Sequence, residues 1–401
     1  MNPLGNTVED SWAAVRNGRS GIGPITRFDA SHMATQIAGE VRNFDYREHF
    51  EGDMAKKAKR MDLFCHYAAA AAREAAEQAS LASIENRQRI GVGLGSGIGG
   101  LNVQHGNSET LTTKGPRRVS PFYIPMSIGN MASGILSIIY GATGPNISMQ
   151  TACATANHSI AMSQMMISHN MADVMIAGGA ESTINEISVA AFGNMRALST
   201  RNDAPEKASR PYDRDRDGFV LSEGAAVLIL EEYEHATRRG APILCEVLAC
   251  GMSGDAYDFV APDPEGTGAG YAMNMALDQA GVTAADIEYV NTHGTSTPVG
   301  DRAELLGVQS VFGNGERSPY IGSTKGYHGH LLGATAGLEA ILTICAMRDG
   351  IVPANINIET PDEDMPRLRL PNENVKTEIR TALSNSFGFG GHNSSLVLRK
   401  L

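Results

Sequence analysis

The sequence predicts an α/β protein in which helices cover parallel sheets, and three observations carry this prediction. Short apolar runs typical of buried strands alternate with stretches of helical periodicity along most of the chain. Hydrophobic residues make up 42% of the 401 residues and charged residues 19%, which provides a core and excludes intrinsic disorder. The second half repeats the element order of the first, which indicates a duplicated fold.

The first half is expected to span residues 1–240 and to begin with a helix. Thr7 is a suitable N-cap for a helix over 8–17, with Glu9 and Asp10 in its first turn. A strand normally precedes such a helix, and none lies before Asn2, so we expect the first sheet to lack its first strand. The other predicted elements are a long alanine-rich helix over 54–79, strands over 89–94, 147–151, 174–177 and 224–231, and a helix over 155–169.

The second half is expected to span residues 241–401 and to restart the pattern. Its predicted strands cover 244–249, 287–292, 320–322, 381–387 and 394–398, and its predicted helices cover 270–280 and 331–349. In each half a strand leads to a reactive side chain near a helix N-terminus, Cys153 in the first and His330 in the second. We therefore expect both residues to face one central cleft.

Composition excludes several classes of function. The formal net charge of −11 argues against nucleic acid as the main partner, and no apolar run approaches the ~20 residues that span a bilayer. The N-terminus has neither the basic start nor the apolar stretch of a secretory signal. The five cysteines are sparse and odd in number, so we expect no disulfide framework, no metal cluster and a cytoplasmic location.

Two motifs that suggest ligands are weak. Gly95-x-Gly97-x-x-Gly100 matches a dinucleotide fingerprint, but the stretch where an acidic residue should follow is basic and turn-like. Asp213-x-Asp215-x-Asp217 imitates the start of a calcium loop, but glycine occupies loop position twelve. Neither motif predicts its ligand here.

Cys153 is the strongest candidate for a nucleophile. It lies in a turn of small residues, 150–156, between a strand and a helix. The helix N-terminus favours negative charge, which predicts a lowered thiol pKa, and small neighbours leave room for a substrate. A buried structural cysteine is the competing interpretation, and the local sequence alone leaves the two about equally balanced.

Three further segments contain candidate residues. His293 heads a Gly/Ser/Thr loop, 293–301, at the carboxyl end of a strand, where α/β sites usually lie. Lys325 precedes His330 by five residues at a helix start. The glycine-rich segment 385–391 is either a plain hairpin turn or a place where a backbone N–H approaches a substrate.

Taken together, these motifs resemble the β-ketoacyl-(acyl carrier protein) synthases of type II fatty acid synthesis, and synthase II in particular. The resemblance covers nearly the whole chain, and four motifs occur in family order: 151–153, 293–297, 323–330 and 385–391. It implies the thiolase fold, in which two similar halves form five α-β-α-β-α layers, and a homodimer. It also implies an acyltransferase that extends acyl chains by decarboxylating Claisen condensation.

The resemblance assigns roles to individual residues. Cys153 takes the acyl group, and the N–H groups of Cys153 and Phe389 form the oxyanion hole. His293 and His330 stabilise the charge that decarboxylation creates. Lys325 maintains the geometry and field around His330, and Glu339 balances its charge.

The resemblance further implies an acyl carrier protein as partner, with no metal and no diffusible cofactor, because phosphopantetheine arrives on that protein. Residues assigned to the acyl pocket or to the phosphopantetheine arm are Ile98, Phe192, Thr295 and Thr297. The basic residues expected to dock the acidic carrier protein lie on one helix and in one nearby segment: Lys56, Lys59, Arg60, Arg117 and Arg118.

Three departures from the family pattern and several alternatives stay open. Besides the missing first strand, Ala156 replaces a usual glycine, and Tyr327 and His328 replace a usual Met-Thr, which bears on substrate preference. A thiolase would carry a second cysteine near the C-terminal glycine motif, where this chain has His392. A polyketide ketosynthase, or a non-catalytic subunit that shapes chain length, remains as an alternative, although the latter usually lacks the nucleophile.

Overall fold

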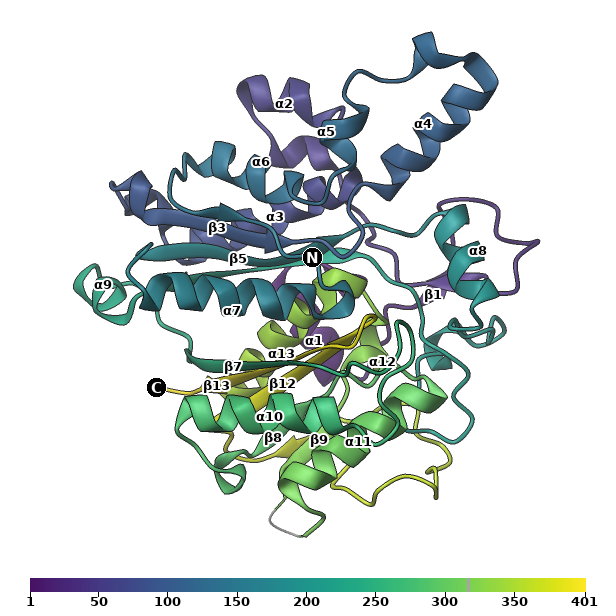
Figure 1. Cartoon of the computed structure of the whole chain (residues 1–401), viewed down its shortest axis with the longest axis vertical. Helices are drawn as coiled ribbons and strands as arrows, with labels where there is room; N and C mark the ends of the chain where they lie inside the picture. The colour runs from purple at the N-terminus through teal and green to yellow at the C-terminus, as the bar shows by residue number, and fades with distance from the viewer. Residues whose placement is uncertain (316–317) are drawn as a thin grey trace.

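The computed structural model describes residues 1–315 and 318–401, and its elements form five layers (Figure 1). The first sheet has the strand order β4-β3-β5-β6 and the second the order β7-β13-β12-β8-β9. Helices α7 and α13 lie between the sheets, α3 and α6 cover the outer face of the first, and α10 covers the outer face of the second, with α11 beside it. The predicted α-β-α-β-α architecture is confirmed.

The strands of the first sheet all precede residue 232, and those of the second all follow residue 245. The first sheet consists of β3 (Ile90–Gly95), β4 (Asn146–Ile147), β5 (Val174–Glu181) and β6 (Gly224–Glu231). The second consists of β7 (Glu246–Gly254), β8 (Tyr289–Asn291), β9 (Tyr320–Gly322), β12 (Thr381–Gly388) and β13 (His392–Arg399). Two small antiparallel pairs lie outside them: β1 (Gly23–Pro24) with β2 (Ile37–Ala38), and β10 (Ile351–Val352) with β11 (Val375–Lys376).

The expectation of parallel sheets is wrong for one strand of each sheet, β6 in the first and β13 in the second. β3 pairs in parallel with β4 and β5, but β6 runs antiparallel to β5. β12 pairs in parallel with β8 and antiparallel with β13, which in turn runs antiparallel to β7. The short 389–391 turn explains the β12–β13 pair, because strands joined by so few residues can pair only as a hairpin.

The helices of the three α layers are long and apolar on the faces that meet the sheets. The outer helices over the first sheet are α3 (Leu63–Gln78) and α6 (Met131–Tyr140), and those over the second are α10 (Thr267–Ala280) and α11 (Pro298–Phe312). The central helices are α7 (Thr155–Ser168) and α13 (Thr335–Asp349). Buried residues on α7 and α13 pack against both sheets, so the two halves share this layer.

One predicted helix is divided, and several were not predicted. The helix expected over 54–79 is α2 (Gly52–Ala58) followed by α3. Between them Asp62 has extended backbone, and its carboxylate accepts the N–H of Val103 at the start of α4 (2.9 Å). The predicted first helix is α1 (Val8–Arg16), and Thr7 caps it through the N–H of Asp10. The unpredicted helices are α4 (Leu101–Lys114), α5 (Tyr123–Ser127), α6, α8 (Glu186–Asn194), α9 (Tyr233–Arg238), α11 and α12 (Lys325–His328).

The chain start lies against strand β6. The amino group of Met1 donates to the carbonyl of Ala225 (3.1 Å), and the Met1 carbonyl accepts from the Ala225 N–H (2.9 Å).

Among the described residues, no helix combines the length and the apolar character needed to cross a bilayer.

The two halves place matching turns at the centre of the molecule. A 3₁₀ turn, Ala152–Ala154, leads into α7, and another, Leu332–Ala334, leads into α13. Both turns open on a left-handed residue, with φ of 49° at Ala152 and 48° at Leu332, and the turns contact each other. The duplicated geometry therefore brings the segments around Cys153 and His330 together.

Candidate active site

Cys153 lies in the turn that precedes α7, where local contacts fix its backbone. The Thr155 hydroxyl accepts the N–H of Thr151 (2.9 Å) and donates to the carbonyl of Ala152 (2.7 Å). The end of β12 lies directly against this turn: a Cβ on Gly388 would stand 2.8 Å from the carbonyl oxygen of Thr151 and 3.0 Å from the nitrogen of Cys153. Only glycine allows β12 to approach the thiol so closely.

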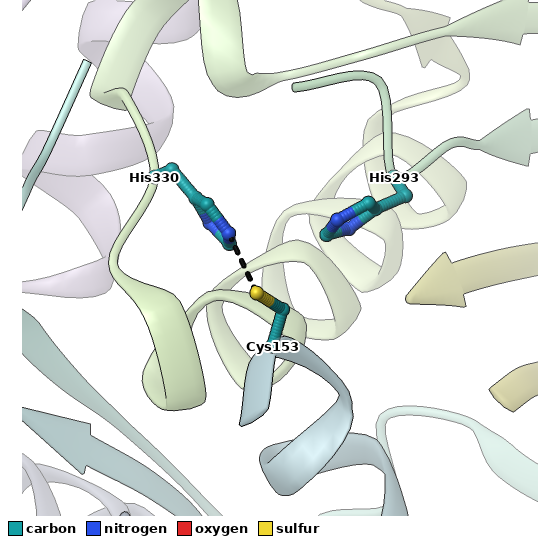
Figure 2. Close-up of side chains that lie close together, drawn as sticks. All are labelled: Cys153, His293 and His330. Atoms are coloured by element: carbon teal, nitrogen blue, oxygen red, sulfur yellow. Dashed lines mark hydrogen bonds between the residues drawn. The ribbon is translucent and has the colours of Figure 1, made fainter. Parts of the chain in front are cut away.

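His330 forms a hydrogen bond with the Cys153 thiol (Figure 2). Its Nε2 lies 3.0 Å from Cys153 Sγ, and its Nδ1 lies 3.0 Å from Thr335 Oγ1 at the start of α13. When Nδ1 carries the proton and donates it to Thr335, Nε2 is free to accept the thiol proton. This arrangement pairs a nucleophile with a base whose ring is itself oriented.

His293 approaches the same thiol from the second sheet. Its ring lies 5.3 Å from that of His330, nearly perpendicular to it, and both rings point toward Cys153 (Figure 2). The Glu304 carboxylate on α11 accepts the N–H groups of His293 and Gly294, each at 2.7 Å, and so fixes the loop. The Sγ and imidazole nitrogen atoms of the three side chains lie within 4.8 Å of one another, a spacing that one metal ion could bridge.

Lys325 lies buried behind the histidines and pairs with Glu339. Its Nζ donates to Glu339 Oε1 at 2.5 Å, and both side chains are almost fully buried. The second carboxylate oxygen of Glu339 is buried without a hydrogen-bond partner among the described residues. The predicted pairing of Lys325 with Glu339 therefore appears in the structure as a buried ion pair.

The expectation of a lowered thiol pKa is wrong, because burial outweighs the helix N-terminus. Burial raises the pKa of Cys153 to about 12, while Lys325 and the N–H groups of Cys153 and Phe389 act to lower it. Burial and the Lys325 charge hold the pKa of both His293 and His330 well below the usual value. At neutral pH the site thus contains a thiol and two neutral imidazoles.

The two N–H groups expected to form an oxyanion hole face the thiol. Those of Cys153 and Phe389 both lie close enough to Sγ to favour its negative charge. They come from opposite halves of the chain, and the Ser386 hydroxyl of β12 donates to the Cys153 carbonyl (2.9 Å), which ties the two segments together. The arrangement offers two preorganised donors beside the nucleophile.

A cavity of about 510 Å³ opens beside these groups, and its lining is mostly apolar. Cys153, His293 and His330 line it, together with Phe389, which was predicted for the oxyanion hole. The predicted substrate residues Ile98, Phe192, Thr295 and Thr297 line it too. Thr295 Oγ1 and Thr297 Oγ1 lie 3.0 Å apart. The structure thus brings together every residue predicted for the acyl pocket and the phosphopantetheine arm.

The predicted docking residues are exposed, but they do not share one helix. Lys56 lies on α2, Lys59 follows its last residue, and Arg60 lies in the turn beyond. The Arg60 guanidinium stacks on the ring of Phe122 (4.2 Å), which places it beside the exposed 3₁₀ turn Pro116–Arg118. The basic residues therefore come from two neighbouring segments and lie outside the cavity lining.

Several residues around the site were not predicted. Thr335 orients His330, Glu304 fixes the His293 loop, and Phe219 packs edge-on against the His330 ring (5.3 Å). Thr335 follows His330 by five residues, and Glu304 would have been found had α11 been predicted. Phe219 carries no local signal, because only the fold brings it near.

The comparisons with known proteins agree with this geometry. The profile of the β-ketoacyl synthase N-terminal domain matches residues 1–236, and that of the β-ketoacyl synthase C-terminal domain matches residues 244–359. The chain is 48% identical over 404 residues to the 3-oxoacyl-[acyl-carrier-protein] synthase 2 of Vibrio harveyi, covering 100% of this chain and 96% of that protein.

Two solved structures share the fold over the whole chain. A β-ketoacyl synthase from Burkholderia phymatum has a TM-score of 0.92 and 31% identity, covering 100% of this chain and 97% of that one. A type II polyketide ketosynthase bound to a hexaketide, in complex with its acyl-carrier protein, has a TM-score of 0.88 and 28% identity with the same coverage. Since both family profiles match and Cys153, His293 and His330 line one cavity, the chain belongs to the β-ketoacyl synthase family.

Proposed function

We propose that the protein is a 3-oxoacyl-(acyl carrier protein) synthase that elongates acyl chains in fatty acid biosynthesis. The observation that carries the proposal is the Cys153–His330 hydrogen bond, with His293 beside it, at an apolar cavity of about 510 Å³. The 48% identity to a synthase 2 over the full chain supports the same reaction class. An acyl chain fits such a lining, and a thioester carbonyl fits the two N–H groups beside the thiol.

In the first half-reaction the enzyme accepts an acyl group. Cys153 Sγ attacks the acyl thioester as its proton passes to His330 Nε2, and the oxyanion is held by the N–H groups of Cys153 and Phe389. The pantetheine sulfur leaves and takes up that proton. Because the resting thiol is protonated, the adjacent neutral imidazole supplies the base that the attack needs.

In the second half-reaction a malonyl thioester loses CO₂ and attacks the acyl-enzyme. The electron pair of the broken C–C bond forms an enolate, whose oxygen is stabilised by hydrogen bonds from His293 and from the Nε2–H tautomer of His330, in which Nδ1 accepts the Thr335 hydroxyl. The enolate carbon then forms the new bond to the acyl carbon, and the Cys153 thiolate leaves and takes up a proton from solvent to restore the resting thiol. Lys325, paired with Glu339, keeps both imidazoles neutral, and Thr295 and Thr297 bind the phosphopantetheine arm. The reaction needs no metal and no diffusible cofactor, since the phosphopantetheine arrives on the carrier protein.

The proposed partners are an acyl carrier protein and a second copy of the chain. The exposed cations Lys56, Lys59, Arg60, Arg117 and Arg118 offer an acidic protein a docking surface within a chain of net charge −11. The homodimer is supported by exposed isoleucines on and beside α5 and α6, discussed below. We also propose a cytoplasmic location, which the five unpaired cysteines support.

A polyketide ketosynthase is the second candidate. The 28% identity to a polyketide ketosynthase favours it, but the 48% identity to a 3-oxoacyl-[acyl-carrier-protein] synthase 2 favours elongation. The intact nucleophile argues against a non-catalytic chain-length subunit. Supplying malonyl carrier protein without reducing enzymes distinguishes the two candidates. A polyketide ketosynthase should condense repeatedly and yield a polyketide, whereas an elongation enzyme should not.

Replacing the nucleophile tests the proposal. Cys153→Ala should abolish the mass increase of the enzyme on mixing with acyl carrier proteins, while its circular dichroism stays unchanged. Cys153→Gln should retain malonyl decarboxylation, because its amide resembles the acylated site. Intact-mass spectrometry with acyl chains of several lengths is the measurement. Acylation of Cys153→Ala at the normal rate would show that the nucleophile is another residue.

A further inference from the structure

A buried carboxylate that the proposed mechanism does not use lies beside the cavity. Glu181 is the last residue of β5, and its side chain is fully buried. Its Oε1 accepts the Ser96 hydroxyl (2.9 Å) and the Ile98 N–H (3.3 Å), and its Oε2 accepts the N–H groups of Gly97 (2.8 Å) and Gly333 (3.0 Å). Within the described residues, no salt bridge reaches this carboxylate.

These donors belong to two different walls of the site. Ser96, Gly97 and Ile98 follow β3, and both Gly97 and Ile98 line the cavity. Gly333 belongs to the turn that begins two residues after His330 and leads into α13. The one carboxylate of Glu181 thus binds the acyl pocket of the first half to the histidine segment of the second.

Beside the carboxylate, the backbones of Gly97 and Gly333 approach so closely that neither position tolerates a side chain. A Cβ on Gly333 would stand 2.3 Å from the nitrogen of Gly97, and one on Gly97 would stand 2.8 Å from Glu181 Oε2. Two backbone turns that present their N–H groups to each other leave those donors unpaired unless an acceptor is inserted. Glu181 supplies that acceptor.

The charge of Glu181 also reaches the nucleophile. Burial raises the pKa of Glu181 to about 7, and the hydrogen bonds from Ser96, Gly97, Gly333 and Ile98 lower it. Its negative charge acts to raise the pKa of Cys153, against the effect of Lys325. Glu181 is therefore close enough to the thiol to influence it without touching it.

We propose that Glu181 is a positioning residue that holds the Ser96–Ile98 wall of the cavity against the Leu332–Gly333 turn, and so fixes His330 relative to the bound acyl chain. It acts through the hydrogen bonds to both walls and touches neither the substrate nor the thiol. The effect of Glu181 on bound acyl chains rests on the proposed synthase function. Its effects on the His330 segment and on the thiol pKa do not.

The test compares Glu181→Gln with the unsubstituted enzyme in two assays. The amide keeps the shape of the carboxylate but removes its charge and one acceptor. We expect kcat for acyl transfer to fall by about tenfold or more with KM changed less, because charge-assisted hydrogen bonds fix the geometry. Alkylation of Cys153 by iodoacetamide should become about threefold faster at pH 8, which corresponds to a thiol pKa lower by about half a unit.

Glu223→Gln is the matched control. Glu223 is another buried carboxylate, next to the start of β6. It accepts hydrogen bonds from Arg27, Tyr67, the N–H of Val41 and the hydroxyl of Ser182, and it does not line the cavity. Its replacement should leave the pH profile of alkylation unchanged even if the thermal midpoint falls. Ser96→Ala, which removes one hydrogen-bond donor to Glu181, should lower kcat and speed alkylation, each by less than Glu181→Gln does.

Two results would overturn the proposal. The first is a folded Glu181→Gln enzyme with unchanged kcat and an unchanged alkylation profile. The second, which decides the matter if Glu181→Gln does not fold, is the same absence of change in Ser96→Ala. If the unsubstituted enzyme is inactive with every acyl thioester, the proposed function fails instead, while the alkylation profiles still test Glu181.

Discussion

The reactivity of Cys153 depends on the side chains that surround its thiol. Burial favours the neutral thiol, and His330 Nε2 at 3.0 Å provides the acceptor that makes deprotonation possible during attack. The helix N-terminus, which the sequence made prominent, contributes less than the loss of water around the sulfur. In the proposed mechanism, Cys153 therefore becomes nucleophilic as its proton passes to His330 during attack, rather than being stored as a thiolate.

Removing the Lys325 charge should shift the pH dependence of the reaction. Lys325 lowers the pKa of His293 and His330, so the double variant Lys325→Met/Glu339→Gln should raise both values. A neutral His330 is needed to accept the thiol proton, so activity is lost as pH falls through its pKa, and a raised pKa moves that loss to higher pH. The acid limb of the kcat profile should therefore shift to higher pH, which measuring kcat against pH for both enzymes would show.

The double variant is chosen because Lys325→Met alone would leave the Glu339 carboxylate buried and unpaired, at a cost of about 3–5 kcal/mol. A kcat profile with the same acid limb in both enzymes would contradict the assigned role of Lys325. Thermal midpoints of the single and double variants separate the effect on stability from the effect on the imidazoles.

Enlarging Ile98 should shorten the accepted acyl chain. Ile98 lines the main cavity and also a second cavity of about 370 Å³ bordered by Ser127, Ile128 and Gly129, so it stands between the two. Ile98→Phe should fill this passage, and since each buried methylene contributes ~0.8 kcal/mol, long acyl groups should lose several kcal/mol. Short chains and malonyl decarboxylation should be spared.

Mass spectrometry of the acylated enzyme with carrier proteins of graded chain length gives the readout for Ile98→Phe. An unchanged chain-length profile would show that the end of the pocket lies elsewhere.

At the scale of single residues, the sequence located the site residues that stand in recognisable motifs. It missed those that only the fold brings close to the site. Cys153, His293 and His330 each stand in a distinctive turn, so their spacing could be interpreted. Glu181 is the last residue of β5, outside every motif singled out above, and its four donors lie 83 to 152 residues away. Contacts over such separations carry no local pattern.

At the scale of elements, apolar runs located the long strands and the central helices, while several outer helices, including α4, α6 and α11, were not predicted. α4 has no buried residue, so it has no apolar periodicity to detect. At the break between α2 and α3, the Asp62 carboxylate contacts α4, and no local propensity records that contact. The reversal of β13 follows from the short 389–391 turn, whereas the reversal of β6 follows from a long connection whose course the sequence does not specify.

Reversing the charges on the α2 segment should weaken carrier-protein docking. Lys56→Glu, Lys59→Glu and Arg60→Glu together should raise KM for carrier-linked substrates with a smaller effect on kcat, because these side chains lie outside the cavity lining. The unsubstituted enzyme should show a KM that rises with salt, since exposed charges are screened over ~8–10 Å. Steady-state kinetics at two ionic strengths measures both.

Acyl pantetheine provides the control for the docking variant, because it lacks the acidic protein. Equal impairment with acyl pantetheine would mean that the substitutions act on the site itself rather than on docking.

At the scale of the whole molecule, one face carries apolar side chains that the chain itself does not cover. Ile124 on α5 and Ile138 on α6 are 62% and 61% exposed, and Ile128 between the two helices is 42% exposed. The same region includes the second cavity beside Ile98 and the short edge strand β4, and α4 projects beyond it (Figure 1). Such a face is typical of a surface that pairs with another copy.

Charges placed on this face should therefore dissociate the proposed homodimer. Ile124→Asp with Ile138→Asp should convert the protein to a monomer in analytical ultracentrifugation, with little loss of monomer fold because both side chains already face solvent. Leu244→Asp, at a similarly exposed residue (54%) just before β7, is the matched control and should leave the oligomeric state unchanged. If the Ile124→Asp/Ile138→Asp protein sediments like the unsubstituted one, the copies meet through another face. If it becomes a monomer that also accepts a different range of chain lengths, the second copy completes the acyl pocket behind Ile98.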